Sequence, residues 1–478
     1  MKRVMWAGLA SIAMAWTAMT GAALAAACGN TAQGFPGFIA EQKKLAAAAG
    51  VSPRAIAVLD GLKYDNDIIK RDRAQNVFSQ SFLDFQAKMI SSYRLKQGKA
   101  LIQKYKPIFD RVQKQYGVPP EVITAFWALE TDFGASTGNF DTIQALATLG
   151  WDCRRPEKFR PQLIASLQLL DHGDLRRDEF KGAWAGEIGQ TQFMAYDYNE
   201  SAVDFDGDGK RDLRNSVPDV LASTASLLRH HGWNPGQPWL QEVKVPAQLP
   251  WDQADIAIQH PRSQWAEWGV TLRDGTPVRA DNVAASLLLP MGRNGPAFLA
   301  YHNFTTSYLK WNESLVYSTT AAYLATRLGG APAVSPGRGS VEPLSYEEVV
   351  VLQNRLSALG YDVGKADGKI GAGTRAAVKD QQLKLGLPAD SYPDAKLIGM
   401  LGRAKPVGPP VKPGSTKKPA PLTVSSEDGT ADAPQPDLPA QAPDAAPAVT
   451  SKTKNLKKPL KPKPPQAEII GGEGDSLY

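Results

Sequence analysis

The spacing of apolar residues along most of the chain is that of α-helices. Apolar side chains recur at steps of three and four residues, which places them on one face of a helix. The clearest runs are Phe109, Val112 and Tyr116, then Leu163, Leu167 and Leu170, and then Val220, Thr224, Leu227 and His231. Residues 28–330 are therefore predicted to form one large, mainly α domain.

The pattern changes between Trp239 and Phe304. The stretches VKVP, SLLLP and FLAYHNF hold consecutive apolar residues, as buried strands do, and Asn294-Gly295 is a typical turn signal. We expect a small β insertion in the helical domain. Helical spacing returns from about Trp311 to Leu328.

Composition divides the chain after residue 330. The segment 331–343, APAVSPGRGSVEP, has the proline and glycine content of a linker. Residues 344–401 return to helical spacing and are expected to form a compact second unit. Residues 402–478 are rich in Pro, Ala and Lys, with no aromatic residue before Tyr478. Such a segment cannot bury enough apolar surface to fold, so we expect a disordered tail.

The N-terminus has the features of an export signal. Lys2 and Arg3 precede an uncharged run that ends in Ala23-Leu24-Ala25, a typical cleavage site. Residues 1–25 are predicted to be a signal peptide, which places the mature protein in the periplasm. Because the run is long for a signal core, an uncleaved membrane anchor is the alternative.

The chain has two cysteines, Cys28 and Cys153. In an exported protein, a pair is most simply a disulfide. The alternative is a lipid on Cys28, because Ala25-Ala26-Ala27-Cys28 resembles a bacterial lipobox, although it lacks the usual leucine. Lipidation would make the protein an outer-membrane lipoprotein, and membrane association is expected only in that case.

Charge and the remaining motifs exclude several classes of function. The net charge of +6 suits partners that carry carboxylates or phosphates but does not choose among them. The basic tail lacks the interleaved aromatic residues of a nucleic-acid groove, so no nucleic acid is expected. No serine-hydrolase or phosphate-loop motif is present, and no organic cofactor is predicted.

Glu130 is the candidate catalytic residue. It follows an apolar helix face made of Val122, Ile123, Phe126 and Leu129. The glutamate lies one turn beyond Phe126, so its carboxyl group is expected at the edge of the apolar stripe. Desolvation there favours the protonated form, which can act as a general acid. A surface glutamate at the end of a helix is the alternative.

The segment GAWAGEIGQTQFM, residues 182–194, is a candidate binding segment. Gln190 and Gln192 offer amide groups to sugar hydroxyls, and Trp184 and Phe193 offer ring faces to sugars. Small residues permit close approach of a ligand to the backbone. These residues are Gly182, Ala183, Ala185, Gly186 and Gly189.

The sequence DFDGDGKRD, residues 204–212, predicts a calcium loop. Asp204, Asp206 and Asp208 occupy positions one, three and five of an EF-hand-like loop, and Gly209 occupies position six. The twelfth position departs from the pattern, because it is an asparagine rather than a glutamate. Asp219 is a candidate closing ligand if the loop is longer than usual. A polar turn without metal is the alternative.

Taken in order, FWALETDFG, GAWAGEIGQTQF, AVDFDGDG and HHGW resemble the lytic murein transglycosylases of the membrane-bound B type. The resemblance implies a lysozyme-like catalytic domain in which Glu130 is the catalytic acid and Gly186, Gly189 and Gln192 line the cleft. It implies structural calcium on Asp204, Asp206, Asp208, the Lys210 carbonyl and, less closely matched, Asp219. Trp311 and Asn312 match an aromatic-Asn pair in the cleft.

The resemblance also implies the reaction. Relatives cut the bond between N-acetylmuramic acid (MurNAc) and N-acetylglucosamine (GlcNAc) of peptidoglycan, and the C6 hydroxyl of the sugar displaces the leaving group to give a 1,6-anhydro end. A hydrolytic glycosidase normally uses two carboxyl groups. The nearest second carboxylate, Asp132, is expected on a different helix face. A hydrolytic muramidase and a non-catalytic peptidoglycan-binding scaffold are the alternatives.

Residues 344–401 resemble the three-helix peptidoglycan-binding domain of wall enzymes. Val378, Gly386 and Leu387 fit that domain. Gln381 departs from it, because the family usually has Phe at this position, which puts strong wall binding in doubt. A small helical spacer is the alternative.

Overall fold

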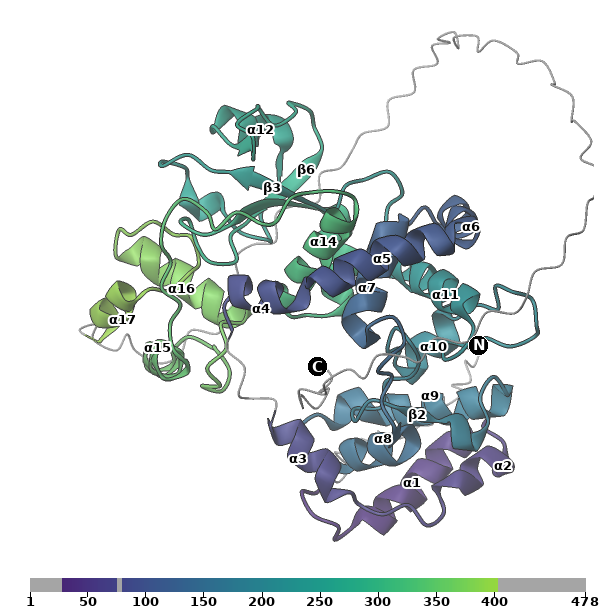
Figure 1. Ribbon diagram of the computed structural model, residues 1–478. Coiled ribbons are helices and arrows are strands. Elements are labelled where there is room, and N and C mark those ends of the chain that lie inside the picture. Colours follow the sequence, from purple (N-terminus) through teal and green to yellow (C-terminus); the bar gives the residue numbers. More distant parts are fainter. Residues whose placement is uncertain (1–27, 75–79, 403–478) are drawn as a thin grey trace, which may run out of the picture. The chain divides into compact units, whose positions relative to one another are not determined.

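The structure is a computed structural model of the chain, and it describes residues 28–74 and 80–402 (Figure 1). The expected signal peptide, residues 1–25, lies outside the described residues, as does the expected disordered tail apart from Gly402. In the part that is described, no helix combines the length and the apolar character needed to cross a bilayer.

The chain is mainly α, as predicted. Before the sheet the elements are α1 (Phe35–Ala48), α2 (Pro53–Ile56), η1 (Ala57–Leu59), α3 (Asn66–Ala74), α4 (Phe82–Met89), α5 (Ser92–Lys104), α6 (Lys106–Tyr116), α7 (Pro120–Thr131), β1 (Phe140–Asp141), α8 (Thr142–Trp151), α9 (Pro156–His172), η3 (Arg177–Glu179), β2 (Lys181–Gly182), α10 (Ala195–Ser201) and α11 (Val217–His230).

Side-chain caps and prolines set several helix starts. Asp141 and Ser216 cap α8 and α11 by accepting a hydrogen bond from a backbone N–H of the first turn. Pro120 stands at the start of α7. Proline lacks a backbone N–H, but no hydrogen bond is lost there because the first N–H groups of a helix have no acceptor within the helix. The helices start where the sequence carries these signals.

The helices build two apolar cores. One lies among α1, α2, α8 and α9, which group together in Figure 1, with Phe159 and Leu163 buried in it. The other surrounds α7, which packs against α5, α11 and α14 (Leu315–Leu328). Residues 122–129 of α7 are all buried. The residue that follows them is therefore held at the boundary of a rigid core.

The expected β insertion is confirmed. The sheet has the order β4-β6-β7-β3-β5 and is antiparallel throughout. Its strands are β3 (Leu240–Lys244), β4 (His260–Pro261), β5 (Thr271–Leu272), β6 (Ala284–Leu288) and β7 (Ala297–Tyr301), with η4 (Trp251–Gln253) and α12 (Arg262–Glu267) between them. Leu287 faces Leu299 across β6 and β7, and Trp265 is buried in the sheet's own core.

The end of the β region differs from the prediction. FLAYHNF was expected to be extended, but the strand stops at Tyr301 and the chain coils into the π-helix η5 (Phe304–Tyr308) and α13 (Leu309–Trp311). Buried Asn303 explains the change, because its side chain binds the backbone of Asn234 and Gln237 and turns the chain away from the sheet. Trp311 therefore ends one helix three residues before Ser314 caps α14.

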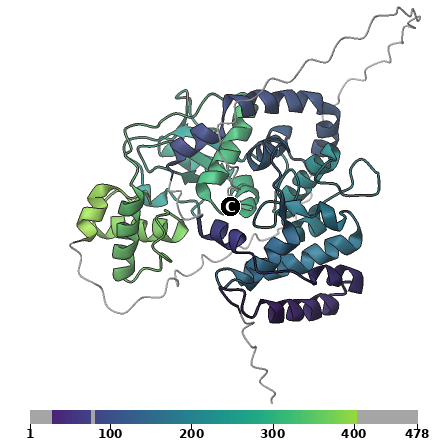
Figure 2. The same cartoon turned by 60° about the horizontal axis from the view of Figure 1, so that its bottom comes forward.

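The second unit is a three-helix domain, as expected. It comprises α15 (Tyr346–Ala358), α16 (Ala372–Lys384) and α17 (Ala395–Leu401), which lie together in Figure 2. Val349, Leu352 and Val378 are fully buried in a core that these helices make themselves. Gln381, where the family usually has Phe, is largely buried and donates from Nε2 to the Tyr361 hydroxyl at 2.5 Å.

Cys28 and Cys153 are joined in a disulfide, with their Cα atoms 5.0 Å apart. The Gly29 N–H donates to the Trp151 carbonyl at 3.0 Å, and Trp151 Nε1 donates to the Thr31 carbonyl at 2.8 Å. The first described residues are thereby held against the end of α8.

Candidate active site

Glu130 occupies the last turn of α7. The helix ends because Asp132 and Phe133 adopt left-handed backbone conformations, with φ of 49° and 62°, and Gly134 follows at 87°. Left-handed residues stop an α-helix, and they are costly for residues other than glycine. The chain bends sharply two residues after Glu130, which leaves this side chain at the rim of the core, half-buried.

Two donors hold one oxygen of Glu130. Trp311 Nε1 donates to Glu130 Oε1 at 2.9 Å, and the hydroxyl of Tyr317 donates to the same oxygen. Burial, followed by the charge of Glu130, raises the pKa of Tyr317 well above its usual value. Tyr317 therefore keeps its proton and serves as a donor. The carboxyl group is oriented by two fixed groups on other helices.

Aromatic rings form a wall beside Glu130. The Trp311 ring stacks on Phe126 with centroids 4.2 Å apart, and it meets Phe193 edge-on at 5.9 Å. Phe126 comes from α7, and Phe193 comes from the candidate binding segment, residues 182–194 (the glycine-glutamine segment). The wall thus joins three parts of the sequence that were predicted separately to form the site.

The glycine-glutamine segment folds as a tight loop closed by Ile188, which pairs with Gly182 on one side and with Phe193 on the other. Gly186 and Gly189 have φ of 96° and 83°, and side chains there would collide with Leu146 and Leu213. The space that a side chain would need at these glycines is therefore occupied by other residues of the protein. Contact of these glycines with a sugar stays a prediction.

The two glutamines differ in their surroundings. Gln192 has φ of 51° and donates from Nε2 to the Gly189 carbonyl at 2.8 Å. Gln190 binds protein groups with both atoms of its amide, Oε1 to Trp127 Nε1 and Nε2 to the Arg214 carbonyl, each at 2.8 Å. Its expected contact with a sugar also stays a prediction.

Asn312 lies directly after Trp311 and is half-buried. Its Oδ1 accepts the Ser314 N–H at 2.9 Å, and its backbone carbonyl accepts the Ser318 hydroxyl at 2.7 Å. The side chain therefore shapes the short break between α13 and α14 that sets the position of Trp311. Its role in the cleft stays a prediction.

A second carboxyl group, Glu187, lies near Glu130. It is 3% exposed, and its Oε2 is buried without a hydrogen-bond partner. Burial is the main reason that its pKa rises to about 7; Lys158 and Arg155 oppose the rise, and Glu130 adds to it. Because Glu187 presents almost no surface, it cannot activate a water molecule on a bound sugar as a hydrolase requires.

Asp132, the nearest carboxylate to Glu130 in sequence, forms an ion pair with Arg94 at 2.6 Å. Arg94 comes from α5, and it also donates to the carbonyl of Met89, the last residue of α4. The ion pair with Arg94 therefore holds the Asp132 carboxylate at the C-terminal end of α7.

The predicted calcium loop, residues 204–212 (the acidic loop), brings two of its carboxylates close to that of Asp219. One oxygen from each of Asp204, Asp206 and Asp219 lies within 4.8 Å of the others, although Asp219 is fully buried. Burial, with Asp206 adding to it, raises the pKa of Asp219. Hard carboxylate oxygens, one of them desolvated, fit a calcium ion.

One predicted side-chain ligand lies outside this group of three carboxylates. Asp208 is not part of it, and its Oδ1 accepts the Lys210 N–H at 2.9 Å. Asp219, the least certain ligand from the sequence, is instead the most buried member. Ligation by Asp208 and by the Lys210 carbonyl stays a prediction.

Sequence reasoning missed Tyr317 and Glu187. Tyr317 lies on the first turn of α14, behind a Ser314 cap, so it resembles an ordinary core residue. The signal for Glu187 was its charge inside an otherwise small and apolar stretch, GAWAGEIG. A lone carboxylate in such a stretch is either buried or functional.

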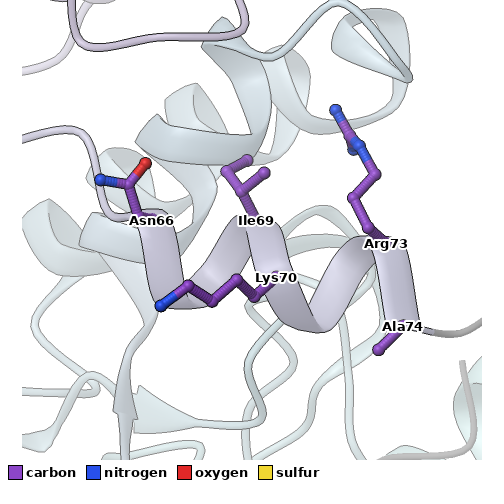
Figure 3. A pocket seen from close by; sticks show the side chains of 5 residues that line it. All are labelled: Asn66, Ile69, Lys70, Arg73 and Ala74. Atoms are coloured by element: carbon purple, nitrogen blue, oxygen red, sulfur yellow. The ribbon is translucent and has the colours of Figure 1, made fainter.

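A separate concavity of about 620 Å³ lies on α3, lined by Asn66, Ile69, Lys70, Arg73 and Ala74 (Figure 3). None of these residues belongs to the site around Glu130.

The fold is similar to that of solved lytic transglycosylases. SltB3 from Pseudomonas aeruginosa, solved in complex with NAG-anhNAM-pentapeptide, is 37% identical, with a TM-score of 0.71 over 78% of this chain and 100% of that chain. Slt35 from Escherichia coli in complex with calcium is 26% identical, with a TM-score of 0.53 over 63% and 95% of the two chains.

A curated relative agrees with these structures. Membrane-bound lytic murein transglycosylase B of Escherichia coli (strain K12) is 31% identical over 241 residues, or 50% of this chain. The match spans 64% of that relative, less than two thirds of its length. Residues 345–401 match a putative peptidoglycan binding domain. Residues 34–326 match the Transglycosylase SLT domain, and this chain therefore belongs to that family of transglycosylases.

Proposed function

We propose that the protein cleaves the bond between MurNAc and GlcNAc in peptidoglycan and leaves a 1,6-anhydro-MurNAc end. The observation that carries the proposal is the setting of Glu130, with two donors on Oε1 and an aromatic wall beside it. The similarity to SltB3, which was solved in complex with NAG-anhNAM-pentapeptide, supports the same chemistry here.

Glu130 would act twice. As an acid it gives its proton to the glycosidic oxygen, and the bond from that oxygen to C1 of MurNAc breaks. As a carboxylate it then takes the proton of the C6 hydroxyl, whose oxygen bonds to C1 and closes the anhydro ring. The proton balance returns Glu130 to its starting state, and no water is consumed. Among the described residues near Glu130, Asp132 is ion-paired and Glu187 is buried, which favours this route over hydrolysis.

We also propose a structural calcium ion. Asp204, Asp206 and Asp219 would hold it, and the calcium complex of the similar Slt35 supports this assignment. The ion would balance the negative charge of three adjacent carboxylates. We assign the ion a structural role, because the acidic loop supports the glycine-glutamine segment and is not part of the aromatic wall beside Glu130.

The three-helix domain is proposed to bind the wall, and the protein to act in the periplasm. The family match of residues 345–401 and the export signal read from residues 1–25 support these assignments. A lipid on Cys28 would require that its sulfur not be bonded to Cys153, as it is here.

The test is the product profile of the mature enzyme on purified peptidoglycan. Mass spectrometry should find disaccharide-peptides lighter by one water than hydrolysis products, with ends that borohydride does not reduce. Reducible ends would show a muramidase instead. Binding without any release would show a scaffold.

A further inference from the structure

Gln190 joins the last turn of α7 to residues 213–214, which follow the acidic loop. It is 8% exposed, and its backbone and its side chain both bind the protein. Its Oε1 accepts from Trp127 Nε1, and its carbonyl accepts from Thr131 Oγ1. Its N–H donates to the Leu213 carbonyl, and Nε2 donates to the Arg214 carbonyl. Two of these contacts are with α7, which carries Glu130, and two are with residues 213–214, directly after the acidic loop.

The first two contacts hold the last turn of α7 on both sides of Glu130. Trp127 Nε1 lies 2.8 Å from Gln190 Oε1, and Thr131 Oγ1 lies 2.5 Å from the Gln190 carbonyl. A Cβ on Gly134 would stand 2.4 Å from Gln190 Oε1, so the bend after Glu130 also packs on this amide. Gln190 thus limits rotation of the turn that carries the carboxyl group.

The other two contacts lead to the acidic loop. Leu213 and Arg214 follow Asp212, whose N–H donates to Asp219 Oδ2 at 2.9 Å. Asp219 Oδ1 accepts the Phe205 N–H at 2.8 Å. A path therefore runs from a carboxylate of the candidate calcium site to the turn that bears Glu130. It consists of the Asp219–Asp212 hydrogen bond, the 212–214 backbone, and the hydrogen bonds of Gln190.

We propose that Gln190 is a positioning residue through which calcium in the acidic loop orders the last turn of α7. The inference deepens the proposed function and rests on it. A cation held by Asp204, Asp206 and Asp219 fixes Asp219, and through Asp212 it fixes the 213–214 backbone. Gln190 transfers that constraint to Trp127 and Thr131. Packed hydrogen-bond networks of this kind carry coupling between sites when both ends depend on one element.

Hydrogen exchange on the full mature chain tests the coupling without any need for activity. In the wild type, calcium alone should slow amide exchange in peptides covering 204–219 and also in peptides covering 124–134. Gln190→Met keeps the side-chain length and the two backbone contacts but removes the side-chain contacts with Trp127 and Arg214. In this variant, protection of 204–219 should persist while the response of 124–134 falls to half or less. The matched control is Trp239→Phe, which removes an indole hydrogen bond to the Ala322 carbonyl away from this path. It should keep both responses.

Activity gives a second measurement. Gln190→Met should lower kcat about tenfold with little change in KM, and calcium should raise kcat by a smaller factor than in the wild type. Thr131→Val, which removes one link, should reduce the calcium response in 124–134 and serves if Gln190→Met does not fold. The inference is overturned if calcium protects the loop alone in the wild type, if it protects neither region, or if Gln190→Met transmits the response undiminished. Failure of the proposed function would appear separately, as a wild type that shows both exchange responses but releases no product.

Discussion

Trp311 Nε1 donates to Glu130 Oε1 at 2.9 Å across 181 positions of sequence. The contact exists because the π-helix η5 and the short α13 carry the indole from the sheet to the end of α7. Tyr317 adds a second donor to the same oxygen. One oxygen is fixed by two donors, so the carboxyl group has one orientation toward a substrate, and this arrangement can be tested residue by residue.

Glu130→Gln is expected to abolish cleavage and to leave the fold and calcium binding intact. The amide keeps an oxygen for Trp311 and Tyr317 but cannot donate and then recover a proton in the reaction. Release of soluble fragments from peptidoglycan should fall below about a hundredth of the wild type. Circular dichroism and the calcium-dependent rise in Tm should be unchanged. Activity above that level would refute the role of Glu130 as general acid.

Tyr317→Phe is expected to lower kcat about tenfold to a hundredfold. It removes a hydroxyl that donates to a carboxyl group, a contact worth about 1.5–3 kcal/mol. The ring and its packing stay, so binding of the glycan should change little. Initial rates at saturating peptidoglycan give kcat, and the dependence on substrate concentration gives KM.

Tyr308→Phe is the matched control for that variant. Tyr308 is also fully buried in the same core, but its hydroxyl has no hydrogen-bond partner. Its removal should leave kcat unchanged and stability unchanged or slightly higher. Equal losses in both variants would mean that Tyr317 acts through packing alone.

Glu187→Gln is expected to flatten the pH dependence of stability. Burial raises the pKa of Glu187 to about 7 from an unfolded value of 4.5. The folded protein therefore binds this proton more tightly than the unfolded chain does. The resulting stabilisation is complete below pH 4.5 and is lost as the pH rises through 7, a change of about 3 kcal/mol.

Urea unfolding of wild type and variant at pH 4.5, 6 and 8 measures that difference. The variant lacks the titration, so its advantage over the wild type should grow by about 3 kcal/mol across the range. Groups shared by both proteins cancel in the comparison. Parallel curves would show that Glu187 ionises in the folded protein as freely as in the unfolded one.

Asp219→Asn and Asp208→Asn test which of these two aspartates contributes more to calcium binding. The structure groups Asp219, and not Asp208, with Asp204 and Asp206. Calcium at about a hundred times its Kd should stabilise the wild type by about 2.7 kcal/mol. Asp219→Asn should remove most of that gain and Asp208→Asn a smaller part, as measured by Tm with calcium and with EGTA. The reverse order would favour the EF-hand spacing read from the sequence.

Local pattern was sufficient to predict the helices, the β insertion and the three-helix unit. It also located Glu130, since an apolar face that ends in a carboxylate is visible within ten residues. The aspartates at alternate positions likewise indicated the acidic loop. These features depend on neighbours in sequence, where helix and strand periods apply.

What the sequence could not show depends on distant pairs. Tyr317 and Gln190 look like common residues until the fold places them beside Glu130 and Trp127. Gln190 was assigned to a sugar because an amide is a good sugar ligand, although its amide atoms both bind the protein. Asp219 stood outside the EF-hand spacing, and only the position of α11 relative to the loop brings it to Asp204. Periodicity carries no information on such contacts.

Loss of the Cys28–Cys153 disulfide is expected to destabilise the protein by about 5 kcal/mol. The bond closes a loop with a sequence separation of 125, and a cross-link of that span removes much of the entropy of the unfolded chain. Cys153→Ser and dithiothreitol treatment of the wild type should lower Tm equally, and dithiothreitol should not affect the variant. Intact-mass analysis of the mature chain checks the state of Cys28, because a diacylglyceryl adduct there would contradict the disulfide. An unchanged Tm after complete reduction would instead show that the contacts around Trp151 hold this segment without the covalent bond.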